Sequence, residues 1–141
     1  MKPVMTIDEI HAFLETDFPQ IHTEGRVFTV KAVEAGRLRM ALDPTDRHLR
    51  PGGTVSGPTL FALADVAAYA VVLAHIGPVA LAVTTNLNIN FLRLPAPKRL
   101  VCDARLLKLG KRLAVIETSI FQDNEEELAA HATATYSIPP R

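Results

Sequence analysis

Several features that mark other classes of protein are scarce in this chain of 141 residues. Its one cysteine, Cys102, cannot form a disulfide within the chain, which is typical of proteins of the reducing cytosol. The 15 basic and 15 acidic residues balance, and this neutrality argues against a nucleic-acid partner, which normally requires a basic surface. Asp8, Glu9 and Glu15 interrupt any apolar run near the N-terminus, so we expect no signal peptide and a cytoplasmic location.

Charge is almost absent between Pro51 and Leu92, where Asp65 is the only ionised side chain. Within this stretch, residues 58–76 are apolar on every side, and Gly77-Pro78 then stops a helix. A helix that is apolar all round has to be buried all round. It is long enough to cross a membrane, but Asp65 and the Gly-Pro stop argue against that. We therefore expect a central helix that the rest of the chain encloses. Asp65 should lie either inside this enclosure or at its boundary.

The segments around this helix are predicted to form one further helix and six strands. Thr6 and Glu9 have the spacing of a capping box for a helix over 7–17. Two strands flank Ala35-Gly36, and four follow the central helix with a period of two. The predicted strands are 27–34, 37–42, 85–91, 100–109, 113–122 and 130–137. Short turns between them imply an antiparallel sheet, with Gly110 expected at positive φ in one hairpin and 123–127 forming the next turn.

Histidine offers no metal-ligand spacing at any of its five positions, so we expect no metal site. His75 is expected to be a favourable residue at the end of the central helix. Asn86, Asn88 and Asn90 share one strand face, which we expect to be solvated or in contact with another subunit. Together these patterns predict one domain over residues 1–141, of α+β class, in which an antiparallel sheet wraps around the long apolar helix.

Four short motifs resemble the hotdog-fold thioesterases, most closely the PaaI-like subgroup named for phenylacetate degradation. They are Gly53–Gly57, Leu63–Asp65, Val83–Arg93 and Leu109–Ala114, and the likeness extends over residues 43–138. The resemblance implies a hotdog fold and a homo-oligomer, either a dimer or a homotetramer, with active sites at the dimer seam. It also implies hydrolysis of an acyl-CoA thioester without a cofactor, since coenzyme A is part of the substrate.

The resemblance assigns three catalytic residues. Asp65 corresponds to the family's catalytic carboxylate, which would act as general base or nucleophile. The backbone N–H of Gly57 corresponds to the oxyanion donor at the start of the helix. Thr84 corresponds to a residue that steadies the attacking water, and a shift of one position would make it Thr85.

This chain also departs from the family pattern. Ser56 replaces the motif histidine, Pro58 replaces a glycine, and Arg50 replaces an asparagine. For substrate binding we expect residues near the helix start and at strand ends or turns, some of them basic groups for the phosphates of coenzyme A. These are Arg50, Ser56, Arg93, Lys111 and Arg112.

The residues themselves also allow other interpretations. Burial of an isolated carboxylate in an apolar helix is unfavourable. Asp65 is therefore expected either to accept hydrogen bonds from a neighbouring segment or to act as a general base. Ser56 is expected to cap the helix rather than act as a nucleophile. An acyl-thioester dehydratase or hydratase would pair a histidine with a carboxylate, and Ser56 argues against it. A non-catalytic acyl-CoA-binding protein is the remaining alternative, and Arg50 and Pro58 favour it.

Overall fold

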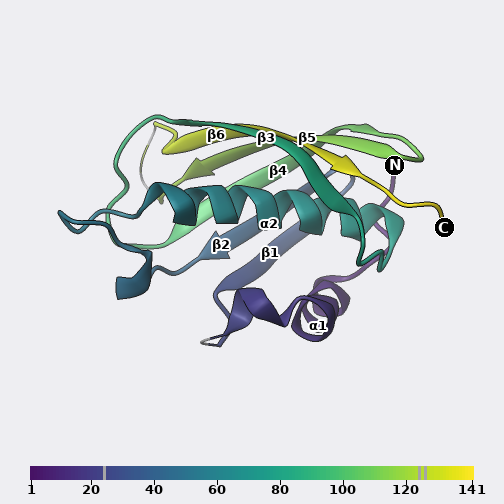
Figure 1. Cartoon of the computed structure of the whole chain (residues 1–141), viewed down its shortest axis with the longest axis horizontal. Helices are drawn as coiled ribbons and strands as arrows, with labels where there is room; N and C mark the ends of the chain where they lie inside the picture. Colours follow the sequence, from purple (N-terminus) through teal and green to yellow (C-terminus); the bar gives the residue numbers. More distant parts are fainter. Residues whose placement is uncertain (24, 124, 126) are drawn as a thin grey trace.

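The long apolar helix lies across a six-stranded antiparallel sheet that curves around it, which confirms the predicted architecture (Figure 1). The computed structural model describes residues 1–23, 25–123, 125 and 127–141. The elements in chain order are α1 (Ile7–Asp17), η1 (Pro19–His22), β1 (Phe28–Glu34), β2 (Arg37–Leu42), η2 (Asp46–His48), α2 (Gly57–Ile76), β3 (Val83–Phe91), β4 (Leu100–Leu109), β5 (Leu113–Phe121) and β6 (Ala130–Ser137). The predicted capping box of α1 is present, with Thr6 and Glu9 each bonding the other's backbone N–H.

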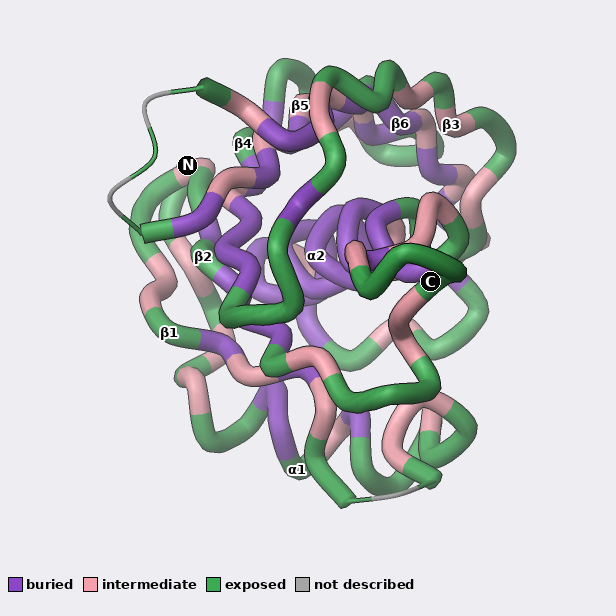
Figure 2. Tube along the Cα trace, turned by 90° about the vertical axis from the view of Figure 1, so that its left-hand side faces the viewer, coloured by how far each residue is buried: buried purple, intermediate pink, exposed green. Residues whose placement is uncertain are grey.

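Most of α2 is buried, as its composition predicts: 14 of its 20 residues are enclosed (Figure 2). Ser56 caps the helix by accepting from the N–H of Thr59, and Gly77 ends it at a φ of +95°. The exception lies near the N-terminal end, where Pro58 and Phe61 are exposed. By length and composition alone α2 could cross a membrane, but 78% of its most apolar window is covered by the rest of the chain.

The sheet has the strand order β1-β2-β4-β5-β6-β3, so β3 lies at one edge. Its outer side pairs with no other strand of the described chain. Asn86, Asn88 and Asn90 are exposed, as predicted for this face. A long edge strand with unpaired backbone groups can accept a strand from another chain.

Two turns differ in how they use glycine. Gly36, in the β1–β2 hairpin, has a φ of +72°. Gly110 was expected to do the same between β4 and β5, and this prediction is wrong because Gly110 does not adopt positive φ. Glycine fits there through close approach instead: its N–H donates to the oxygen of Leu113 at 2.8 Å, and a Cβ would lie 3.2 Å from that oxygen. The predicted turn over 123–127 lies partly outside the described residues, since it includes positions 124 and 126.

His75 joins the end of α2 to the β1–β2 hairpin. Its Nε2 accepts from the N–H of Gly36 at 2.8 Å, and its Nδ1 lies 2.8 Å from the oxygen of Val71. The predicted place of His75 in the last turn of the helix is confirmed, and there its ring also accepts from a turn N–H that needs a partner.

Candidate active site

Asp65 lies in the middle of α2 and is itself half-buried, although the residues around it on the helix are buried. Its Oδ1 accepts two short hydrogen bonds, from the hydroxyl of Thr84 at 2.6 Å and from the hydroxyl of Tyr136 at 2.6 Å. No described residue donates to its Oδ2. The carboxylate is thus held by one oxygen, and the other is left to accept from a molecule outside the chain.

Thr84 reaches Asp65 because of a β-bulge at the start of β3. Thr84 pairs with Tyr136 and Asn86 pairs with Thr135, so Thr85 is an extra residue between them. A strict alternation would place Thr85 on the inner face with Leu87, but the bulge reverses this. Thr85 is exposed and donates to the oxygen of Thr135 at 3.2 Å. Of the two threonines, only Thr84 meets Asp65.

Tyr136 was not among the residues predicted for the site. It lies on β6, is 2% exposed, and its hydroxyl also lies 3.0 Å from the backbone oxygen of Asp65. Burial, and then the charge of Asp65, raises the pKa of Tyr136, which therefore remains a protonated donor. The signal in the sequence was a buried phenol on an otherwise small-residue strand face, since a buried hydroxyl needs a hydrogen-bond partner.

A cavity of about 290 Å³ opens beside Asp65. Its lining comprises Asp17, Phe18, Asp65, Tyr69, Ala80, Ala82, Val83, Thr84 and Tyr136. Three aromatic rings form one wall: Tyr69 stacks on Tyr136 with centroids 6.0 Å apart, and Phe18 meets the edge of Tyr69 at 5.9 Å. The hydroxyl of Tyr69 donates to the oxygen of Ala80 at 3.0 Å. The cavity is therefore apolar and aromatic around one carboxylate on α2 and another on α1.

Gly57 is the first residue of α2, and its N–H has no acceptor among the described residues. Ser56 acts as the N-cap, as predicted: its hydroxyl accepts from Thr59 and lies 2.9 Å from the Thr59 hydroxyl. Gly57 and Asp65 are eight residues apart on one helix, or about 12 Å along its axis. One chain therefore does not bring these two predicted groups together.

A second cavity, of about 330 Å³, lies beside the start of α2. It is lined by residues of the helix start, of η1 and η2, and of β1 and β2. They are Gln20, Ile21, Thr23, Val27, Phe28, Leu42, Arg47, His48, Ser56, Pro58, Thr59, Ala62 and Val66. The backbone oxygen of His48 accepts from the N–H of Ser56 at 2.9 Å, which fastens this wall to the helix start.

The basic residues predicted to bind substrate are spread over both ends of the sheet. Arg50 is exposed in the turn before α2. Lys111 and Arg112 are exposed in the β4–β5 turn, at the end of the sheet where β3 begins, because Leu113 and Val83 both pair with Ser137. The structure therefore does not gather these side chains into one cluster within a chain.

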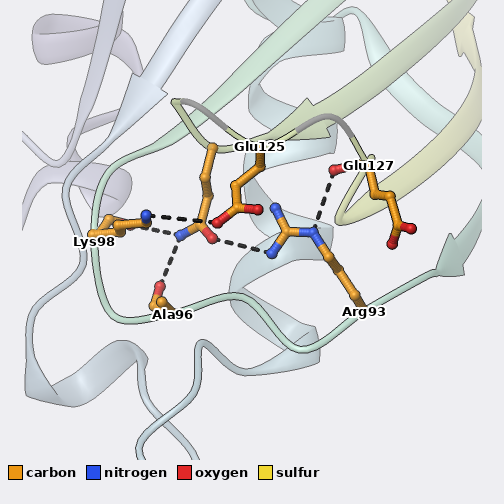
Figure 3. A network of polar contacts seen from close by, with 6 residues as sticks. Arg93, Ala96, Lys98, Glu125 and Glu127 are labelled. Carbon is orange, nitrogen blue, oxygen red and sulfur yellow. Dashed lines mark hydrogen bonds and ion pairs between the residues drawn. The ribbon is translucent and has the colours of Figure 1, made fainter.

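Arg93 is engaged in a structural network at the opposite end (Figure 3). Its Nε donates to the oxygen of Glu127 at 3.3 Å and its Nη1 to Gln122 at 3.2 Å. Gln122 in turn donates to the oxygens of Ala96 at 2.8 Å and Lys98 at 3.2 Å. These contacts give Arg93 a role in fastening the β3–β4 connection.

Metal binding finds no support in residues 1–23, 25–123, 125 and 127–141, where no three His, Cys, Asp or Glu side chains converge as ligands.

Comparison with known proteins agrees with this geometry. The family model of the thioesterase superfamily matches residues 52–129. A protein of Silicibacter sp. TM1040 named "putative thioesterase" is 51% identical, with a TM-score of 0.89 over 99% of this chain and 96% of that one. A phenylacetic acid degradation-related "putative thioesterase" of Ralstonia eutropha JMP134 is 30% identical, with a TM-score of 0.73 over 86% of this chain and 98% of that one.

A curated relative extends the comparison. A "putative esterase" of Saccharolobus solfataricus is 28% identical over 139 residues, which cover 96% of this chain and 87% of the relative. The family match covers more than half of the chain, and the long helix wrapped by an antiparallel sheet is the hotdog fold. The chain therefore belongs to the thioesterase superfamily, among the PaaI-like thioester hydrolases of the hotdog fold.

Proposed function

We propose that this thioesterase hydrolyses acyl-CoA thioesters and that Asp65 activates water or attacks the thioester carbonyl itself. One observation carries the proposal: Oδ1 of Asp65 is occupied by Thr84 and Tyr136, whereas Oδ2 accepts from no described residue and the carboxylate lines a cavity. Coenzyme A as the carrier is supported by smu.793 of Streptococcus mutans, a structural neighbour with a TM-score of 0.71, which was solved bound to acetyl CoA.

Two routes use the same oxygen. As a general base, Oδ2 takes a proton from water while the water oxygen attacks the carbonyl carbon, and the collapsing intermediate expels the thiolate, which is then protonated. As a nucleophile, Oδ2 attacks the carbonyl carbon itself and expels the thiolate, and water then hydrolyses the resulting anhydride. Thr84 would orient the water in either route. No cofactor is needed, since coenzyme A enters with the substrate.

The oxyanion donor would come from a second copy of the chain. Gly57 of the same chain lies too far along α2 to reach a carbonyl that Asp65 attacks, because a donor must lie about 3 Å from the oxyanion. A homodimer that pairs the β3 edges would bring Gly57 of one protomer toward Asp65 of its partner. Large apolar side chains are exposed on and beside this edge: Phe61, Leu81, Val83, Phe91, Leu92 and Leu94. A dimer, or a dimer of dimers, in the cytoplasm is therefore the proposed form.

Exposed basic groups would bind the phosphates of coenzyme A. Lys111 and Arg112 are proposed for this role because they lie at the end of the sheet where Thr84 meets Asp65. Arg50 is proposed as a further contact beside the start of α2. Ser56 is better assigned to the helix cap and Arg93 to its structural network.

The test is Asp65→Asn, which keeps an acceptor for Thr84 and Tyr136 but cannot take a proton or form the anhydride. We expect acyl-CoA turnover to fall by about 10²- to 10⁴-fold with the fold intact. Asp103→Asn, on the outer face of β4 and paired with Arg39, is the matched control and should retain wild-type turnover. Unchanged turnover in Asp65→Asn would remove the mechanism. Binding of a non-hydrolysable acyl-CoA analogue, with no hydrolysis of any acyl-CoA in a panel, would favour a binding protein instead.

A further inference from the structure

Tyr136 occupies an unusual position on the inner face of β6. The three preceding residues on that face are alanines that are 0 to 1% exposed: Ala130, Ala132 and Ala134. Tyr136 follows them and extends under α2, where its ring stacks on Tyr69. Phenylalanine would fill the same space and make the same ring contact. Packing therefore does not explain the hydroxyl.

A phenol hydroxyl that is removed from water is unfavourable unless it is hydrogen-bonded. The hydroxyl of Tyr136 finds its nearest partner, at 2.6 Å, in Oδ1 of Asp65. The strength of such a bond depends on the charge of the acceptor, since hydrogen bonds to ionised groups are the stronger ones. This bond therefore ties the hydroxyl of Tyr136 to the carboxylate that carries the proposed reaction.

The same oxygen accepts from Thr84, which lies opposite Tyr136 in the β3–β6 ladder. The bulge at Thr85 turns Thr84 inward, so two neighbouring strands aim one donor each at a single carboxylate oxygen. Two donors on Oδ1 hinder rotation of the carboxylate and leave Oδ2 as the oxygen that substrate or water can reach.

We propose that Tyr136 is a positioning residue for the hydrolytic reaction: with Thr84, it fixes the orientation of the Asp65 carboxylate. This inference rests on the proposed function of Asp65. Tyr136 does not exchange a proton with the substrate, since it remains a donor throughout the cycle.

Tyr136→Phe tests the proposal because it keeps the stacked ring and removes only the hydroxyl. We expect kcat to fall by about 10- to 100-fold, the loss that corresponds to one hydrogen bond to a charged group, with KM changed far less. Thr84→Val, which removes the other donor to Oδ1, should also lower kcat with a far smaller change in KM, and so gives the same readout from a second variant.

Tyr69→Phe is the matched control. It removes a second buried phenol hydroxyl from the same cavity, one that donates to the oxygen of Ala80 and not to Asp65. Its kcat should fall far less than that of Tyr136→Phe. If Tyr136→Phe and Thr84→Val both keep the wild-type kcat while Asp65→Asn is inactive, the positioning role is refuted and the proposed function stands. If Asp65→Asn remains active, both fail.

Discussion

The proposed oxyanion donor can be tested by moving a single N–H along the first turn of α2. Gly57 supplies an N–H and Pro58 has none, so the double substitution Gly57→Pro with Pro58→Ala exchanges the two positions. Proline is favoured at the first helical residue, where its missing N–H would be unpaired in any case. Ser56 already has φ −75° and ψ 153°, which is the conformation adopted by a residue that precedes proline.

The size of the effect follows from what surrounds that N–H. In the native chain no neighbour duplicates this N–H, because residue 58 lacks one and the N–H of Thr59 is bound to Ser56. In the double variant the N–H of the alanine at position 58 lies one residue further along, about 100° round the helix axis, and so points away from the position that the Gly57 N–H serves. Loss of one oxyanion donor raises the barrier by about 3 to 4 kcal/mol, or about 10²- to 10³-fold in kcat. Stability should change little, because a Cβ at position 57 would meet only the ring of Phe91, at an ordinary contact distance of 3.6 Å.

The assay follows the release of coenzyme A thiol from an acyl-CoA with a thiol-reactive dye, beside a thermal melt. Pro58→Ala alone is the control, since it keeps the Gly57 N–H and adds a second one, and its kcat should stay close to wild type. If the double variant melts like the wild type and turns over at the wild-type rate, the N–H of Gly57 plays no part in the reaction.

Two further outcomes are expected. If each active site combines Asp65 of one protomer with Gly57 of the other, refolding Asp65→Asn together with the double variant should regain about a quarter of wild-type activity. Half of the dimers would then be mixed, and each mixed dimer would hold one intact site. A mixture as inactive as its components would contradict the shared site. Stability should decrease in mild acid, because burial and then the charge of Arg26 lower the pKa of His11 from 6.5 while its Nε2 accepts from Val30. The unfolded chain then takes up the proton first, so this part of the stability is complete above about pH 6.5 and is lost as the pH falls through the lowered pKa. His11→Gln keeps an acceptor that cannot titrate, and its melting temperature should fall less between pH 7 and pH 5, although His22, whose pKa burial also lowers, will retain some dependence.

The helices were predictable from the sequence because their signals are local. Thr6 with Glu9 determines the start of α1, and Ser56 and Gly77 determine the two ends of α2, through contacts within a few residues of each end. Strand limits were predicted less closely, and β3 begins two residues before the predicted start. Its alternating pattern begins only after the bulge, where Asn86 resumes regular pairing with β6.

The site was harder to predict because its contacts join distant segments. Thr84 and Thr85 are equivalent in composition, and only the pairing of β3 with β6 determines which of them faces α2. Tyr136 meets Asp65 across 71 positions of sequence, and an inner-face tyrosine does not reveal what lies opposite it. Gly57 was identified through the family resemblance. That it lies too far from Asp65 to act with it in one chain follows only from the length of helix between the two residues.

The network around Gln122 places a mechanical constraint on the start of α2 (Figure 3). The buried amide of Gln122 ties the β3–β4 connection at Ala96 and Lys98 and also binds Arg93, two residues after Phe91. Phe91 in turn lies against Gly57. A residue just after β5, outside the lining of both cavities, thus restrains the end of β3 beside Gly57, and the rigidity of the oxyanion corner depends on one buried amide.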